Sequence, residues 1–508
     1  MSKLLPEAAL ARTQAHARHV RNDDLAQLDA WLVVIADDLS DAAWRTLPRG
    51  EWLRAECQRR KLRSGAVITA RLDTPAQTLL IAGMRTRHAS VFEALQLAGR
   101  MVKEAKSSQA RLVGVSTLGL PGAAASDSLE AVVAATYAAG FELPSFKSKQ
   151  DAANSLAELR LFSPRANGAW RLTRATSEGN NLARWLTALP GNALTAASYR
   201  RRVTQLARRE GWRWQFLDSR ALKRRGAGAF LAVAQGNEND DAGIIHLRYR
   251  PRARKSGRKL VALVGKGVCF DTGGTNLKAH RSMLDMHIDM EGSAVALGTL
   301  LALTRLNAGF AIDCWLAVTE NRIGPRAYKP QDVVSASNGV SIQVIHTDAE
   351  GRMVLADALA LAVRERPALL LDFATLTGAC VNALTERYTG LFTNRPSWHA
   401  ILERAGTESG ERVWRFPMDG DFDTDLDSPI ADIKQCAADN KGDHILAARF
   451  LNRFVPAEIP WVHLDLAAGQ RTGGLGHITT DITGFGVRYA VNLLTAQGIL
   501  ERAAGKSP

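Results

Sequence analysis

The chain has 508 residues, 46% hydrophobic and 23% charged, which is the balance of a folded globular protein rather than a disordered one. No apolar run approaches the roughly 18 to 20 residues of a membrane-spanning helix, and the first 30 residues lack the apolar block of a secretory signal. We therefore expect a cytoplasmic protein without a membrane partner. The five cysteines are widely spread and form no C-x-x-C pair, which excludes a disulfide scaffold and favours reduced, buried thiols.

The net charge of +14 is unevenly distributed along the chain. Residues 171–260 contain 20 Lys and Arg against 6 Asp and Glu, whereas residues 261–508 contain 23 against 28. A basic segment of this kind could neutralise DNA phosphates, or it could simply be a solvated, arginine-rich face. Because no nucleic-acid-reading motif accompanies the charge, DNA binding through residues 171–260 is kept only as an additional or alternative role.

Residues 1–165 alternate short apolar runs with amphipathic runs, which predicts a small N-terminal α/β domain. Its strands are expected at 31–35, 67–71, 78–82 and 111–115, and its clearer helices at 91–105 and 128–139. A polar stretch at 163–170 marks the domain boundary. A helix that ends before Pro190 makes residues 166–190 the connection to the next domain.

Residues 191–508 show longer apolar strands that alternate with helices. We expect strands at 244–249, 259–264, 311–318, 341–346, 368–373 and 461–466, and helices at 293–305, 353–365 and 444–455. Nearly continuous apolar strands separated by helices indicate a buried, largely parallel central sheet with helices on both faces. Open α/β sheets bind ligands at the carboxyl ends of their strands, so we expect the functional residues directly after the strands.

The first such cluster follows the strand at 259–264. Lys266 lies between two glycines, Asp271 precedes a Gly pair, and Lys278 and Asp289 come after it. The Gly-rich turn lacks the residue order of a phosphate-binding loop. Asp285 lies four residues before Asp289, so the two carboxylates would repel on one helical face unless a cation were near or Asp285 were solvated.

The second cluster follows the strand expected at 341–346. Asp348 and Glu350 are two residues apart, and in an extended segment their side chains would point the same way. A capping box at the next helix explains one carboxylate, but not Asp348, Glu350 and Arg352 together. Several carboxylates at adjacent strand ends repel one another unless a divalent ion neutralises them. An oxygen-rich set without cysteine suits Mg, Mn or Zn in a two-metal site.

These segments resemble the leucyl aminopeptidase (cytosol aminopeptidase) family, peptidase family M17. The T-D-A-E-G-R run at 347–352 is the signature of that family, and the intervals of 5, 7 and 11 residues that separate Lys266, Asp271, Lys278 and Asp289 agree with its pattern. The resemblance extends from about residue 178 to the C-terminus. It fades over the first 165 residues, where that family varies, and so implies a variable N-terminal domain.

The resemblance implies a metal-dependent aminopeptidase that releases apolar, leucine-like N-terminal residues from short peptides by attack of a metal-bridging water. Two divalent ions, Mn or Zn, would bind each subunit. The tighter ion would be held by Lys266, Asp271, Asp289 and Glu350. The more exchangeable ion would be held by Asp271, Asp348 and Glu350. Lys266 could be a ligand only as a neutral amine.

The resemblance also implies roles for residues outside the metal set. Lys278 would polarise the scissile carbonyl, and Arg352 would hold a bicarbonate that acts as general base. The pocket for the first side chain, with its backbone donors, would be formed by Met286, Thr375, Leu376 and Gly378. The family usually assembles as a homohexamer. This chain departs from the family pattern at His346, where an Asn is usual, and at residues 442–445, where the family is richer in glycine.

Overall fold

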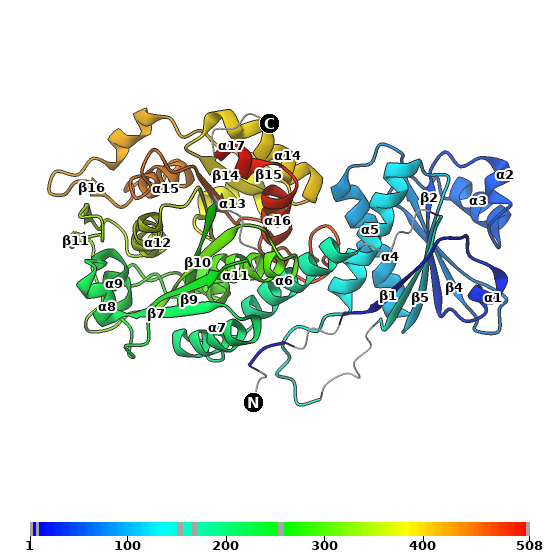
Figure 1. Cartoon of the computed structure of the whole chain (residues 1–508), viewed down its shortest axis with the longest axis horizontal. Coiled ribbons are helices and arrows are strands. Elements are labelled where there is room, and N and C mark those ends of the chain that lie inside the picture. Colours follow the sequence, from blue (N-terminus) through cyan, green and yellow to red (C-terminus); the bar gives the residue numbers. More distant parts are fainter. Residues whose placement is uncertain (1–3, 7–9, 150–155, 165–169, 252–258, 504–508) are drawn as a thin grey trace.

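The computed structural model describes residues 4–6, 10–149, 156–164, 170–251 and 259–503. Two sheets organise the chain: one lies in the N-terminal part and the other in the larger C-terminal part (Figure 1). Helices cover both sheets, which confirms the predicted α/β class. The boundary expected at residue 165 and residues 252–258 of the basic segment 171–260 lie outside the described residues.

The N-terminal sheet has six strands in the order β1-β6-β5-β2-β4-β3. All neighbouring pairs are parallel except β3 with β4. The strands are β1 (Arg12–His16), β2 (Ala30–Ala36), β3 (Val67–Arg71), β4 (Leu79–Arg85), β5 (Leu112–Leu118) and β6 (Glu158–Phe162). Its helices are α1 (Asn22–Leu25), α2 (Asp41–Trp44), α3 (Gly50–Arg59), α4 (Val91–Ser107) and α5 (Gly122–Ala139).

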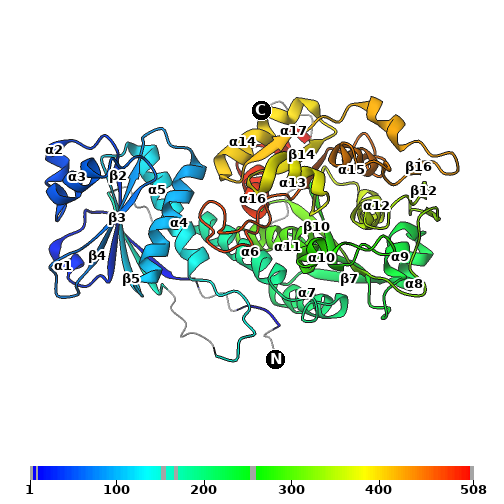
Figure 2. The same cartoon turned by 180° about the vertical axis from the view of Figure 1, so that it is seen from behind.

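The two faces of this sheet bury separate apolar clusters. Helices α4 and α5 cover the face that looks toward the larger part of the molecule, whereas α2 and α3 cover the outer face (Figure 2). Helix α4 begins where Ser90 and Glu93 form a reciprocal capping box. Glu130 of α5 accepts hydrogen bonds from Arg488 at 2.9 and 2.8 Å, which fixes the N-terminal part against the C-terminal part.

The central sheet has eight strands in the order β15-β14-β17-β13-β9-β10-β8-β7. The middle four are parallel, and β14 and β8 flank them in antiparallel pairs. The strands are β7 (Arg213–Asp218), β8 (Gly243–Tyr249), β9 (Leu260–Asp271), β10 (Ala311–Asn321), β13 (Leu369–Ala374), β14 (Thr389–Thr393), β15 (Val413–Arg415) and β17 (Trp461–Asp465).

Helices pack on both faces of the central sheet. One face carries α6 (Arg171–Thr187), α7 (Ala196–Glu210), α11 (Glu291–Arg305), α14 (His399–Ser409), α16 (Val487–Thr495) and α17 (Ile499–Ala503). The other carries α8 (Ser219–Arg224), α9 (Gly228–Ala234), α12 (Glu350–Ala362) and α15 (Asp443–Asn452). Short helices α10 (His280–Met283) and α13 (Gly378–Leu384) lie in the connections.

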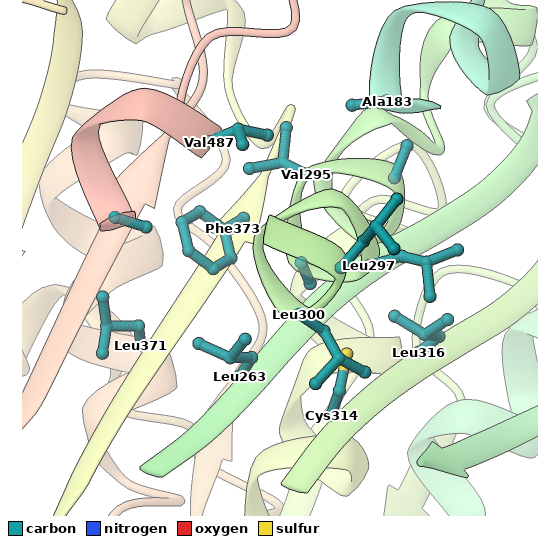
Figure 3. Packing of buried hydrophobic residues seen from close by; sticks show 14 of the residues in the cluster. Ala183, Leu263, Val295, Leu297, Leu300, Cys314, Leu316, Leu371, Phe373 and Val487 are labelled. Atoms are coloured by element: carbon teal, nitrogen blue, oxygen red, sulfur yellow. The ribbon is translucent and has the colours of Figure 1, made fainter. Parts of the chain in front are cut away.

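The buried helix α11 packs closely on the parallel core. Figure 3 shows its side chains interleaved with those of the strands, among them Val295, Leu300, Leu263 and Phe373. A Cβ on Gly292 would lie 2.1 Å from the Phe373 carbonyl oxygen, and a Cβ on Gly265 would lie 2.4 Å from Ser293 Cα. Only glycine allows this approach, and it places the residues just before α11 beside the end of β9.

Several elements differ from the sequence predictions. Strand β9 continues to Asp271 because residues 265–268 still pair with β10. The strand expected at 341–346 is limited to β12 (Ser341–Gln343), which pairs with β11 (Val333–Ser335) and β16 (Ile433–Lys434) in a small sheet of its own. The expectation that the second carboxylate cluster follows a strand of the central sheet is therefore wrong.

Other sequence predictions are confirmed or extended. All five cysteines are free and buried, as expected. Helix α6 ends at Thr187, before Pro190, as expected for the connecting helix. Within the described ranges, no helix combines the length and the apolar character that a membrane span requires.

Candidate metal centre

Lys266 is a buried cation among the carboxylates of the centre. It lies within β9, it is 2% exposed, and its Nζ is 2.7 Å from Asp289 Oδ1 and 2.9 Å from Glu350 Oε1. The same amine donates a hydrogen bond of 2.9 Å to the Thr375 carbonyl oxygen. Burial disfavours the charged amine, but the carboxylates of Asp289, Glu350 and Asp271 outweigh burial and raise the pKa of Lys266.

Asp271 is the last residue of β9, and neighbouring groups orient its carboxylate. Its Oδ1 accepts hydrogen bonds of 2.8 Å from the Gly273 amide and from Asn321 Nδ2. Asn321 is the last residue of the adjacent parallel strand β10 and is in register with Asp271. Sequence reasoning missed Asn321; the available signal was a polar side chain at the end of the neighbouring strand.

Lys278 lies against two carboxylates of the centre. Its Nζ is 2.9 Å from Asp271 Oδ2 and 2.5 Å from Asp348 Oδ1. Burial opposes the charge, but Asp271, Glu350 and Asp348 outweigh it and raise the pKa of Lys278. The structure therefore places Lys278 as a cation at the mouth of the centre, with a side chain that is 13% exposed.

The loop that carries Asp348 is held by Thr347. The Thr347 hydroxyl donates to the Gly273 carbonyl at 2.7 Å, and the Thr347 carbonyl accepts from Tyr328 OH at 2.7 Å. Asp348 lies in a turn, and Glu350 is the first residue of α12, so the extended backbone expected here is wrong. The capping alternative also fails, because the N-cap residue is Ala349 and no side chain caps this helix.

The carboxylates form a set that fits a divalent cation. Asp271, Asp348 and Glu350 each offer an oxygen within 4.8 Å of the other two. Among the described residues, Asp289 Oδ2 and Glu350 Oε2 are buried without a hydrogen-bond partner. Burial, Asp271 and Glu350 raise the pKa of Asp348 to about 7. Buried, mutually repelling carboxylates with free oxygens are the donor set that Mn or Zn would satisfy.

Arg352 is paired differently from the sequence expectation. Its side chain is 2% exposed, and its Nη2 donates to both oxygens of Asp443 at 2.7 Å. Its Nη1 donates to the Gln435 carbonyl at 3.2 Å. The remaining nitrogen, Nε, is buried. Asp443 therefore provides an anion for this guanidinium within the chain itself.

The residues expected at the substrate pocket lie around the centre. The Thr375 hydroxyl donates to Asp289 Oδ1 at 2.7 Å, and Leu376 packs so close to Gly351 that a Cβ there would lie 3.0 Å from Leu376 Cδ1. Gly378 opens α13 and has free space where a Cβ would be. Met286 is half-buried in the short 3₁₀ helix Met286–Ile288, which leads to Asp289.

Two residues near the metal set lie apart from it. Asp285 is exposed, in agreement with its interpretation as a solvated carboxylate. His346 Nδ1 accepts a hydrogen bond of 3.2 Å from the Asp348 amide and thereby supports the loop rather than the carboxylates.

Comparisons with known proteins agree with this geometry. A family model described as "Cytosol aminopeptidase family, catalytic domain" matches residues 181–491. A probable cytosol aminopeptidase of Synechococcus sp. strain CC9311 is 36% identical over 458 residues, which are 88% of this chain and 90% of the relative. One from Synechococcus sp. strain JA-3-3Ab is 37% identical over 456 residues, which are 87% and 88% of the two chains.

Two solved structures share the fold. A tomato leucine aminopeptidase variant superposes with a TM-score of 0.83 at 26% identity and covers 97% of each chain. The bottromycin maturation enzyme BotP in complex with Mn has a TM-score of 0.79 at 29% identity and covers 92% of this chain and 99% of its own.

The fold, the carboxylate cluster and these similarities define a metal-dependent hydrolase. The chain belongs to the cytosol aminopeptidase family, peptidase family M17, and is an aminopeptidase of that family.

Proposed function

We propose that this aminopeptidase releases apolar, leucine-like residues from the N-termini of short peptides with two divalent ions in each subunit. The observation that carries the proposal is the convergence of Asp271, Asp348 and Glu350 beside Lys266. Such a set gives two neighbouring ions shared carboxylate ligands. Mn or Zn is the proposed metal, and the structural similarity to BotP in complex with Mn supports Mn.

The proposed ligand sets follow the contacts in the centre. Lys266, Asp289, Asp271 and Glu350 would hold the tighter ion, and Asp271, Asp348 and Glu350 the exchangeable one. When bound, these ions would lower the pKa of a coordinated water and thus supply the nucleophile. Lys266 would have to lose its proton to become a ligand, because it is a cation among carboxylates in the metal-free protein.

Lys278 is the proposed electrophile for the scissile carbonyl. Its amine is held between Asp271 and Asp348 and is partly open to solvent, so metal ions that take over those carboxylates would free the amine for substrate. A cation placed where negative charge develops stabilises the transition state.

The free space at Gly378, together with the apolar side chains of Met286 and Leu376, supports a pocket for an apolar first residue.

This specificity is tested with dipeptides that share the second residue and differ in the first. We expect Leu and Met to be released faster than Asp, Lys or Gly, and N-acetylated Leu peptides to resist hydrolysis. Equal rates for all first residues would contradict the apolar preference, whereas cleavage of the acetylated peptide would contradict exopeptidase action.

We also propose a homohexamer located in the cytoplasm. The names of the relatives support the location. Large apolar side chains exposed on the C-terminal part support the assembly, because exposed apolar groups mark interfaces: Leu277, Leu284, Ile323 and Val333. Sedimentation velocity is the test, and a monomer at micromolar concentration would contradict the hexamer.

DNA binding is a second proposed role, and it rests on one edge of the central sheet. Arginine and lysine side chains are exposed along α7, β7 and α8: Arg201, Arg208, Arg209, Arg213, Arg220, Lys223 and Arg224. By contrast, Arg184 and Arg202 of the same basic segment are buried. Electrophoretic mobility of duplex DNA tests the role, and the absence of a shift above ~100 mM salt would contradict it.

A further inference from the structure

The Arg352–Asp443 pair lies beside the metal centre without belonging to the metal set. Arg352 follows Glu350 by two residues on α12. Gly351, between them, lies so close to Lys266 that a Cβ on it would be 2.8 Å from Lys266 Nζ. The guanidinium is buried, so it requires an anion close by. Asp443 supplies that anion with both carboxylate oxygens.

Asp443 is placed so that its carboxylate remains accessible. It is the first residue of α15, its side chain is 19% exposed, and the preceding Gly442 has a φ of 60° with nothing near where a Cβ would be. The left-handed glycine turns the chain so that the helix begins with its carboxylate directed at Arg352. The carboxylate is therefore oriented by Arg352 and is still partly exposed.

The segment that carries Asp443 is tied to the metal-binding loop by Gln435. The Gln435 side-chain oxygen accepts from the amides of Ile345 and His346 at 3.1 Å, and its Nε2 donates to the Ala349 carbonyl at 3.0 Å. Its carbonyl accepts from Arg352. The loop that carries Asp348 and the segment that leads to Asp443 thus share one hydrogen-bonded frame.

We propose that Asp443 is the general base of this enzyme and replaces the external bicarbonate that an unpaired Arg352 would hold. This inference rests on the proposed peptidase function. The Asp443 carboxylate accepts one proton from the attacking water while the water oxygen bonds to the scissile carbonyl carbon. The proton then passes to the amine nitrogen as the C–N bond breaks. The carboxylate returns to its starting state, and no further reactant is consumed.

The test compares wild type, Asp443→Ala and the control Asp439→Ala in buffer freed of carbon dioxide, with and without added bicarbonate. Asp439 is the matched control because it lies four residues before Asp443, in the loop that leads to α15, and pairs only with the exposed Lys441 among the residues described. Hydrolysis of Leu dipeptides gives kcat, and the ¹³C NMR signal of labelled bicarbonate with metal-free protein gives binding independently of activity.

We expect wild type and Asp439→Ala to be insensitive to bicarbonate and to bind none at millimolar concentration. We expect Asp443→Ala to lose roughly 100-fold or more in kcat, to bind bicarbonate, and to recover at least about tenfold when it is added. Asp443→Asn keeps the side-chain shape but cannot accept the proton, so it should be as slow as Asp443→Ala. Because it also leaves the buried Arg352 without its anion, we expect it to unfold at a lower temperature than wild type while remaining folded at the assay temperature.

Three results would overturn the inference. Wild type could require bicarbonate, Asp443→Asn could keep the wild-type kcat, or a folded Asp443→Ala could neither bind bicarbonate nor recover with it. A wild-type protein without any peptidase activity would instead remove the proposed function. In that case the binding comparison still decides whether Asp443 occupies the anion position on Arg352.

Discussion

Asn321 links the two loops of the metal centre through its contact with Asp271. Its Nδ2 donates to Asp271 Oδ1 at 2.8 Å and to the Thr347 carbonyl at 3.0 Å. One amide at the end of β10 therefore orients a proposed metal ligand and holds the turn that presents Asp348. Groups that orient metal ligands in this way affect metal affinity almost as much as the ligands themselves.

Replacing Asn321 should weaken metal binding without removing a ligand. For Asn321→Ala we expect the affinity for Mn to fall by about 10- to 100-fold, because Asp271 loses a donor and the 347–350 turn loosens. Isothermal titration calorimetry of the metal-free protein with Mn measures this affinity. Asn22→Ala, an exposed position in α1, is the control and should bind as wild type does. Unchanged affinity in Asn321→Ala would contradict the orienting role.

The close packing of α11 on the sheet should be required for the geometry around Lys266. In Gly292→Ala the new methyl group would collide with the Phe373 carbonyl, so α11 must shift and carry Asp289 with it. We expect a loss of about 1–3 kcal/mol in the free energy of unfolding, together with weaker Mn binding.

Gly309→Ala is the matched control for that substitution. A Cβ at Gly309 meets nothing within 4 Å, and its backbone is not in the left-handed region. Urea unfolding and Mn titration should leave this variant at wild-type values. Equal effects of the two substitutions would show that the approach of α11 to β13 is unimportant.

Stability should fall with rising pH because of Asp357 in α12. Burial raises the pKa of Asp357 from 3.8 to about 6, even though its oxygens accept hydrogen bonds of 2.7 Å from the Phe230 and Ser337 amides. The folded protein therefore holds this proton more tightly than the unfolded chain. The free energy of unfolding is therefore unaffected by Asp357 below about pH 4. It decreases as the pH rises from about 4 to about 6, and the full loss is reached above about pH 6.

Asp357→Asn isolates this contribution, since the amide does not titrate. Between about pH 4 and 6 we expect wild type to lose about 3 kcal/mol in free energy of unfolding relative to the variant. Chemical unfolding of both proteins across this range gives the difference. A constant difference at all pH values would show that Asp357 is ionised throughout.

The sequence specified the sheet better than it specified the loops that complete the centre. Strand β3 (Val67–Arg71) was predicted at its observed bounds because its residues alternate between buried and exposed. The continuation of β9 to Asp271 was missed because Gly265 and Gly267 read as the end of a strand. These glycines instead allow α11 and β10 to approach.

The other differences between the predicted and the observed site concern residues that come together from distant parts of the chain. Lys266 and Asp271 could be grouped from sequence because they are five residues apart, directly after the strand predicted at 259–264. Asp348 was placed after a strand of the central sheet, but β12 pairs elsewhere, and the turn is positioned through Thr347 and Asn321. The partner of Arg352 lies 91 positions along the chain at Asp443, a distance that no local pattern reveals.

The most direct test of the account is metal-dependent hydrolysis of a Leu dipeptide. The protein is stripped of metal, assayed, and assayed again after addition of Mn, Zn, Co or Mg, with Asp348→Ala treated identically. The account predicts no turnover without metal, release of free leucine after addition of Mn or Zn, and little or no recovery in Asp348→Ala. Turnover by the fully stripped protein, or equal activity of Asp348→Ala, would contradict a metal centre built on these carboxylates.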